Sequence, residues 1–146
     1  MGRICFGPCL KDRKGITGGV RLGATYLHNW SIRTLPMANL DKLDYNNQFV
    51  HDEKPAFYKG RFDVTECFDT FLYLDEWNKG NVWINGFNIG RYWNIGPQKT
   101  LYVPGVLLKK GANQVVVFDI HHQSSNLTVE FIDKHILNGQ ENENKK

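Results

Sequence analysis

The stretch GNVWINGFNIGRYWNIGPQKTLYVPG, residues 80–105, decides the fold of this chain. Two apolar runs, Val82–Ile84 and Phe87–Ile89, flank the dipeptide Asn85-Gly86. Asn and Gly tolerate the positive φ angles of a type I′ turn, so this pattern is a strong signal for a β-hairpin. A further short apolar run, Thr100–Val103, follows. We therefore expect a hairpin and then another strand.

Strand patterns continue on both sides of this stretch. Apolar and polar residues alternate over 56–64, which predicts a strand with one buried face. Asp69–Asp75 is apolar on both sides, as in the middle of a sheet, and the valine-rich run Asn113–Ile120 would be a poor helix. Residues 127–131 alternate again. About seven short strands predict an all-β fold, a two-sheet sandwich of the jelly-roll type.

Composition agrees with an all-β protein and excludes several classes of function. The 146 residues include 13% aromatics and 14 glycines, which suit strands and turns. The net charge of +3 comes from scattered basic residues, so we expect no nucleic-acid partner. No apolar run approaches the length of a membrane span, and no signal peptide is evident, which leaves the compartment open. Cys5, Cys9 and Cys67 lack zinc-site spacing, so we expect no metal and no cofactor.

The chain divides into four parts. Residues 1–35 contain two short apolar runs that resemble strands in need of partners, Gly18–Gly23 and Tyr26–Ile32. Residues 36–54 are polar and fit a linker better than a helical turn. Residues 55–136 carry the sandwich pattern, and the polar tail 137–146 is predicted to be disordered. Unpaired strand edges in the first part leave self-association open.

Catalytic constellations are absent from the sequence. A glycosidase needs two carboxylates that face each other across the scissile bond, and the acidic residues here form no such pair. We expect them at solvated strand edges, and we interpret His121-His122 as a loop pair because no nucleophile motif accompanies it. We assign no catalytic residue. The four strand-edge carboxylates are Asp63, Asp69, Asp75 and Asp119.

The aromatic cluster of the opening stretch offers two interpretations. Exposed Trp or Tyr rings stack on the apolar face of a pyranose, and Asn or Arg side chains bind its hydroxyls. Against this, Trp83 lies between apolar neighbours, and the following segment ends at a Gly-Pro turn where bulky rings close a sandwich. Core or domain-interface packing is the interpretation that we favour. The carbohydrate-contact candidates in this stretch are Trp83, Arg91, Tyr92 and Trp93.

The motif Lys79–Trp93, followed by Gly96-Pro-Gln98 and Thr100–Pro104, closely resembles the C-terminal galactose-binding-like jelly-roll domain of β-galactosidases of glycoside hydrolase family 35. The likeness continues on either side and covers nearly the whole second half of the chain. It implies that residues 55–136 adopt the family's jelly-roll β-sandwich.

The start of the chain resembles the same family. Met1-Gly-Arg3, Gly7 and Lys14-Gly-Ile16 look like a segment in the latter half of the family's preceding β-domain. The resemblance implies that residues 1–35 are a remnant of that domain and that the chain is a fragment. Phe6 stands where the family has a Tyr that reaches toward the sugar pocket. Phe6 can stack on a sugar but has no hydroxyl to bind one.

The resemblance also implies a role. Family members hydrolyse terminal β-linked galactose with two glutamates on a (β/α)₈ barrel, and no part of this sequence fits such a barrel. We therefore expect a non-catalytic accessory region whose partner is the catalytic barrel, with a compartment that the family leaves among secreted, periplasmic and lysosomal. The alternatives are a free-standing carbohydrate-binding module that recognises galactosides and an interaction module that pairs strands with another chain.

Overall fold

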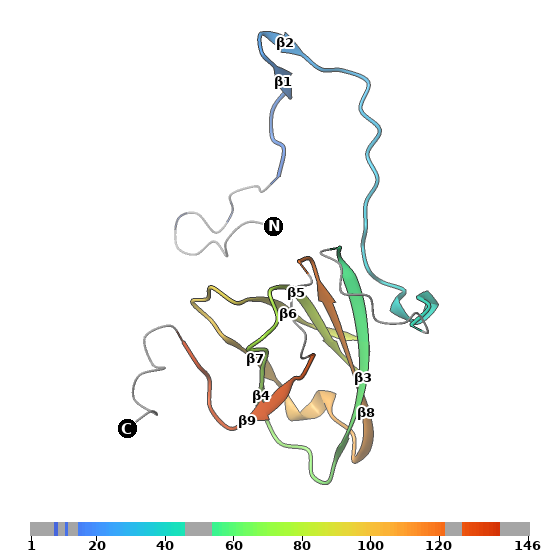
Figure 1. The fold of residues 1–146 in the computed structure, drawn as a ribbon, viewed down its shortest axis with the longest axis vertical. Helices are drawn as coiled ribbons and strands as arrows, with labels where there is room; N and C mark the ends of the chain where they lie inside the picture. Colours follow the sequence, from blue (N-terminus) through green and yellow to red (C-terminus); the bar gives the residue numbers. More distant parts are fainter. Residues whose placement is uncertain (1–7, 9–10, 12–14, 46–53, 122–126, 138–146) are drawn as a thin grey trace. The chain divides into compact units, whose positions relative to one another are not determined.

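The computed structural model describes residues 8, 11, 15–45, 54–121 and 127–137. The chain falls into two compact units, residues 1–38 and residues 39–146 (Figure 1). Phe6 and the tail 138–146 lie outside the described residues, so the structure does not test the predictions made for them.

The first unit contains a very short hairpin. Strands β1 (Arg21–Leu22) and β2 (Thr25–Tyr26) pair in antiparallel register around a turn with Gly23 at φ 60. The predicted strands Gly18–Gly23 and Tyr26–Ile32 are therefore wrong over most of their lengths. Longer strands would need another strand as a hydrogen-bonding partner, and the described part of this unit contains none. Residues 27–38 have no regular structure. Large apolar side chains of this unit remain exposed: Ile16, Leu22, Tyr26, Trp30, Ile32 and Leu35.

The second unit is built from two antiparallel sheets, which confirms the predicted all-β sandwich. One sheet has the order β3-β8-β5-β6 and the other the order β7-β4-β9. The described residues contain no α-helix, and therefore no helix long and apolar enough to cross a membrane. The strands are β3 (Ala56–Val64), β4 (Thr70–Tyr73), β5 (Lys79–Ile84), β6 (Phe87–Trp93), β7 (Thr100–Val103), β8 (Gly111–Asp119) and β9 (Glu130–Ile132), and single 3₁₀ turns are η2 (Leu40–Lys42) and η3 (Gly105–Leu107).

The predicted hairpin joins β5 to β6. Asn85 and Gly86 both have positive φ angles, 49 and 84, as a type I′ turn requires, which confirms the prediction. A register shift follows between Val82 and Trp83. Beyond it the pairing resumes, and β6 continues to Trp93, well past the Ile89 at which the apolar run ends.

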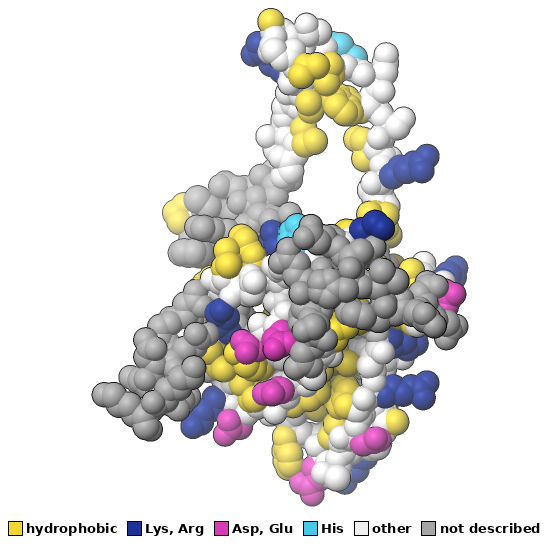
Figure 2. Space-filling model, in the orientation of Figure 1, with side chains coloured by type: hydrophobic (Ala, Val, Ile, Leu, Met, Phe, Trp, Pro, Cys, Tyr) yellow, Lys and Arg dark blue, Asp and Glu magenta, His cyan; other side chains and the backbone are white. Residues whose placement is uncertain are grey.

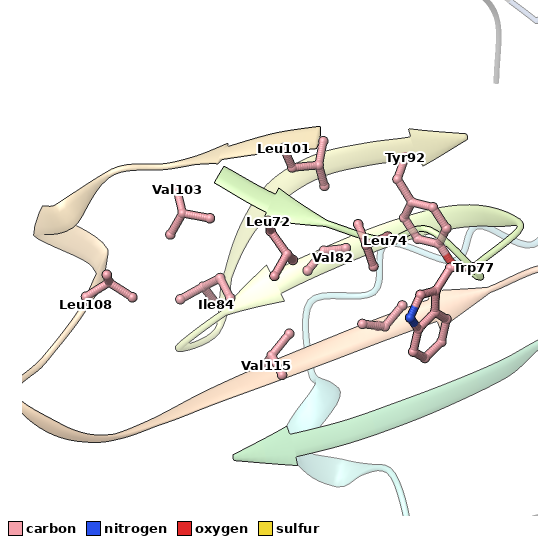
Figure 3. Close-up of a cluster of buried hydrophobic side chains, with 11 residues drawn as sticks. Leu72, Leu74, Trp77, Val82, Ile84, Tyr92, Leu101, Val103, Leu108 and Val115 are labelled. Atoms are coloured by element: carbon pink, nitrogen blue, oxygen red, sulfur yellow. The ribbon is translucent and has the colours of Figure 1, made fainter. Parts of the chain in front are cut away.

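The hydrophobic core lies between the two sheets (Figure 3). Leu72, Leu101 and Val103 of the three-stranded sheet face Val82 and Ile84 of the four-stranded sheet, and all five are at most 5% exposed. Complete burial of one such side chain stabilises the fold by roughly 1.5–3 kcal/mol. The alternation of apolar residues in the strands thus places one face of each sheet in a common core.

The two sides of the sandwich differ. On one side β6 lies beside β7, where the chain crosses from one sheet to the other. On the other side the outer strands are β3 and β9, and the rings of Phe62 and Phe131 meet there at a centroid distance of 4.5 Å. Strand β3 pairs along its whole length with β8, from Ala56 opposite Asp119 to Val64 opposite Gly111.

Candidate functional site

The outer face of the four-stranded sheet carries two of the predicted contact residues side by side. Trp93 lies opposite Lys79, and Arg91 lies opposite Asn81, in the β5–β6 register. The ammonium nitrogen Nζ of Lys79 lies 4.2 Å from the centroid of the Trp93 indole, a cation–π contact. Arg91, Trp93 and Asn81 are half-buried. This group combines an aromatic ring with hydrogen-bonding side chains, but Lys79 already covers one face of the ring.

Trp83 also lies on the outer face, but it is packed into the protein. Only 4% of its surface is exposed, and its ring lies 6.3 Å from the ring of Phe57 on the neighbouring part of the sheet. Phe57 in turn packs against Phe118 at 4.5 Å. Trp83 therefore has no free face on which a sugar could stack.

Tyr92 points to the opposite face of the sheet and is part of the core. It is 4% exposed, and its hydroxyl donates a 2.9 Å hydrogen bond to Oδ2 of Asp119. Burial, together with the charge of the Asp119 carboxylate, raises the pKa of the Tyr92 hydroxyl far above its ordinary value. The four candidates of the opening stretch thus do not form one site: Arg91 and Trp93 lie together, whereas Trp83 and Tyr92 are buried.

Asp119 corrects the prediction that the strand-edge carboxylates are solvated, because only 2% of it is exposed. Its carboxylate accepts hydrogen bonds from the backbone N–H groups of Asn78 at 2.9 Å and His121 at 2.8 Å, besides that from Tyr92. These three donors replace water around the charge. Asp119 therefore fastens the end of β8 to the turn before β5. His122 lies outside the described residues.

A small hollow lies beside Trp93. It has a volume of about 10 Å³ and is bordered by Tyr73, Asp75, Asn94 and Lys99. This volume holds about one water molecule, so the hollow cannot enclose a sugar ring. The Tyr73 hydroxyl donates a 2.6 Å hydrogen bond to Oδ1 of Asp75. A sugar could only lie on the surface here. Among the described residues, no group of His, Cys, Asp and Glu could hold a metal ion.

A much larger groove lies on the side of the sandwich where β3 and β9 are the outer strands, which we call the open side. The sequence did not predict this groove. Its volume is about 800 Å³, and none of the predicted contact residues lines it. Figure 2 shows basic side chains along the flank where Figure 1 places β3, and Lys59 and Arg61 of that strand border the groove. The apolar and aromatic residues that line it are Leu43, Tyr45, Pro55, Ala56, Phe57, Tyr58, Phe62, Trp77, Val115, Val117, Leu127, Val129 and Phe131.

The polar groups of two aromatic residues that line the groove, Trp77 and Tyr45, donate hydrogen bonds to backbone carbonyls. The indole N–H of Trp77 donates a 2.7 Å hydrogen bond to the carbonyl of Thr128, and the hydroxyl of Tyr45 donates one of 3.2 Å to the carbonyl of Leu40. A groove that binds sugar would offer such groups to its ligand. The alternation over 56–64 was a signal for its apolar wall, but only the spatial order of the strands shows that no strand of the described residues covers that wall.

Comparison with known proteins gives two adjoining matches. The profile of the family described as "Beta-galactosidase, galactose-binding domain" matches residues 55–113, and that described as "Beta-galactosidase, first all-beta domain" matches residues 1–36. These matches confirm the resemblance found in the sequence.

Curated relatives match over most of this chain. "Beta-galactosidase-1-like protein" of Mus musculus is 42% identical, with 94% of this chain and 23% of the relative covered. "Beta-galactosidase 1" of Dictyostelium discoideum is 39% identical, with 82% and 19% covered. "Beta-galactosidase" of Bos taurus is 35% identical, with 94% and 25% covered. The chain thus spans about a quarter or less of the length of these relatives.

Proposed function

We propose that this chain, whose two units match the first all-β and galactose-binding domains of β-galactosidases, is a non-catalytic accessory β-sandwich region of such an enzyme. The observation that carries the proposal is the extent of the match, 94% of this chain but only 25% of the bovine β-galactosidase. In this proposal the parent enzyme hydrolyses terminal β-linked galactose, and the region supports and borders its catalytic barrel.

The contacts of the acidic residues support a non-catalytic role. A glycosidase needs one carboxyl group that donates a proton and a second that acts as nucleophile or base, both facing a cleft. Here Asp69 accepts hydrogen bonds from the hydroxyl of Tyr102 and the N–H of Gly105, and Asp119 is buried. Both carboxylates are thus committed to holding the fold together.

An exchange of domains tests the accessory role. We would replace the matching region of the bovine β-galactosidase with this chain and measure the hydrolysis of a chromogenic β-galactoside. The chimera is expected to be active, whereas the same enzyme without the region is expected to be inactive or insoluble. This chain alone is expected to be inactive. Hydrolysis by the isolated chain would contradict the non-catalytic role, provided that the activity persists after contaminating enzymes have been removed.

A second candidate function rests on the outer face of the sheet. Trp93 is half-buried there, beside Arg91 and Asn81, which could bind the hydroxyls of a galactoside stacked on the indole. In this alternative the chain is a free-standing carbohydrate-binding module. The cation–π contact with Lys79 and the small size of the neighbouring hollow favour the accessory role instead.

A further inference from the structure

The two sheets of the sandwich differ in their extent. Strand β3 has nine residues on the open side of the four-stranded sheet, whereas β9, the outer strand of the three-stranded sheet, has three. Much of the inner face of β3 therefore has no strand of the described chain opposite it. Tyr58 and Phe62 on β3, and Val129 ahead of β9, remain half-buried as a result.

The edge of β9 offers a place for another strand. Among the described residues β9 pairs only with β4, through Tyr73 with Glu130, Leu72 with Phe131 and Phe71 with Ile132. Its outer edge therefore presents backbone groups that can hydrogen-bond to an added strand. A strand in that position would lie over β3 and give the second sheet a fourth strand.

We propose that the groove binds an extended polypeptide segment of the parent β-galactosidase that pairs with the outer edge of β9. Alternate side chains of this segment are apolar and enter the groove between Tyr58 and Val129. This inference rests on the proposed function, because the segment comes from the three quarters of the relatives' length that this chain does not match.

The charges at the rim define the segment further. Two basic residues of β3, Lys59 and Arg61, and one acidic residue, Asp44, are exposed and border the groove, so basic charge is in excess there. Lys59 lies 5.0 Å from the centroid of the Tyr45 ring, and Arg61 forms no ion pair with any residue that the structure describes. An acidic residue of the segment is therefore expected beside Arg61. A sugar is a poorer fit, because Trp77 and Tyr45 have already committed their donors to backbone carbonyls.

The test uses short overlapping peptides that tile the part of the bovine β-galactosidase outside the matched region. The full chain is titrated with each peptide, and binding is measured by fluorescence polarisation and by hydrogen exchange at Glu130–Ile132. At least one peptide with alternating apolar residues and an acidic residue is expected to bind and to slow that exchange. If no peptide binds, the inference is overturned, and an active chimera in the domain exchange would leave the proposed function intact.

Two variants locate the binding. Val129→Lys places a charge in the apolar groove, and Arg61→Glu reverses the charge at its rim; each is expected to weaken binding about tenfold or more. The matched controls Thr128→Lys and Lys110→Glu change exposed side chains and are expected to bind the peptide as tightly as the unaltered chain does. Peptide binding that survives Val129→Lys would overturn the assignment. So would a dimer of the chain that Val129→Lys dissociates, or a galactose-dependent shift of the Trp77 indole signal.

Discussion

The side-chain amide of Asn85 donates a 2.8 Å hydrogen bond to Oδ1 of Asn113, which ties the tip of the β5–β6 hairpin to the start of β8. Asn85 also donates to the carbonyl of Leu107 at 2.7 Å and accepts from the N–H of Gln114 at 3.0 Å. The turn residue that selects the hairpin thus also fixes the hairpin against two other segments.

Replacement of Asn113 is expected to disrupt this network. Asn113 is 3% exposed, and its amide group donates to the carbonyls of Lys109 at 2.7 Å and Gly111 at 2.9 Å. Asn113→Ala removes all of these hydrogen bonds together with the buried amide group, and it is expected to lower the free energy of unfolding by about 2–4 kcal/mol. Urea denaturation measures the loss, with Lys110→Ala as an exposed control. Equal midpoints for the two variants would contradict this role.

Gly80 marks a close approach of two strands. A Cβ atom added at this position would overlap the backbone carbonyl oxygen of Phe118, the residue of β8 beside it. Gly80→Ala is therefore expected to cost at least about 3 kcal/mol or to prevent folding, because backbone cannot move aside as a side chain does. Gly18→Ala is the control, since its Cβ meets nothing within 4 Å. Thermal unfolding of both variants tests the contrast, and a wild-type melting temperature for Gly80→Ala would refute it.

Asp69 is expected to make the fold sensitive to acid. The N–H of Gly105, and then the hydroxyl of Tyr102, hold the pKa of Asp69 below its usual value near 4. A lowered folded pKa gives stability that is present above the unfolded pKa and is lost as the pH falls through the folded pKa. The advantage of the wild type over Asp69→Asn should therefore shrink below about pH 4. Urea midpoints between neutral and acidic pH measure this. Asp63→Asn serves as the exposed control, and an advantage over Asp69→Asn that stays constant with pH would count against the prediction.

Tyr92 is expected to make the fold sensitive to alkali, whereas Asp69 makes it sensitive to acid. Tyr92→Phe removes one of the donors to the buried Asp119 carboxylate and should cost about 1–3 kcal/mol at neutral pH. Because burial and Asp119 raise the pKa of Tyr92, its contribution is present below the unfolded value and is lost as the pH rises beyond it. The difference between wild type and Tyr92→Phe should shrink above about pH 10. Chemical denaturation across that range is the measurement, and a difference that grows there would show the sign to be wrong.

Galactose is expected to leave the outer face of the sheet unchanged. Lys79 covers one face of Trp93, and the adjoining hollow of about 10 Å³ cannot receive a sugar ring. The indole resonance of Trp93 in the ¹⁵N-labelled chain should not shift saturably at millimolar galactose or lactose. Lys79→Ala uncovers the ring and serves as the comparison. A saturable shift in the parent chain that disappears in Trp93→Ala would instead support the carbohydrate-binding module.

Local signals predicted most strands of the second unit, but residues 127–129 of the predicted last strand lie outside β9, which is Glu130–Ile132. Asn85-Gly86 needs no distant contact to select its turn, and Thr100–Val103 has the same bounds in the structure as in the prediction. The predicted strand Tyr26–Ile32 was largely wrong, because a strand also needs a partner and the sequence pattern does not show whether one is there.

The candidate site was less predictable than the strands. Trp83, Arg91, Tyr92 and Trp93 are neighbours in sequence, but the alternation of side chains and the register shift in β5–β6 send them to different surroundings. Asp119 looked solvated because two of its three donors, the N–H of Asn78 and the hydroxyl of Tyr92, come from distant parts of the chain. The groove is formed by the order of strands in two sheets, which is a property of the topology and not of any one segment.

The pairing of β3 with β8 sets the order of events during synthesis. Among the described residues, β3 has no other partner in its sheet, and β8 is the last strand of that sheet to leave the ribosome. Because β5 also pairs with β8, the sheet cannot assemble until residues 111–119 have emerged. Before that point β3, with the apolar side chains of Tyr58 and Phe62, has no strand to pair with while most of the domain is translated. Until residues 111–119 are available, the apolar side chains of β3 have no sheet to pack in, which is the condition under which an incompletely folded chain is prone to aggregate.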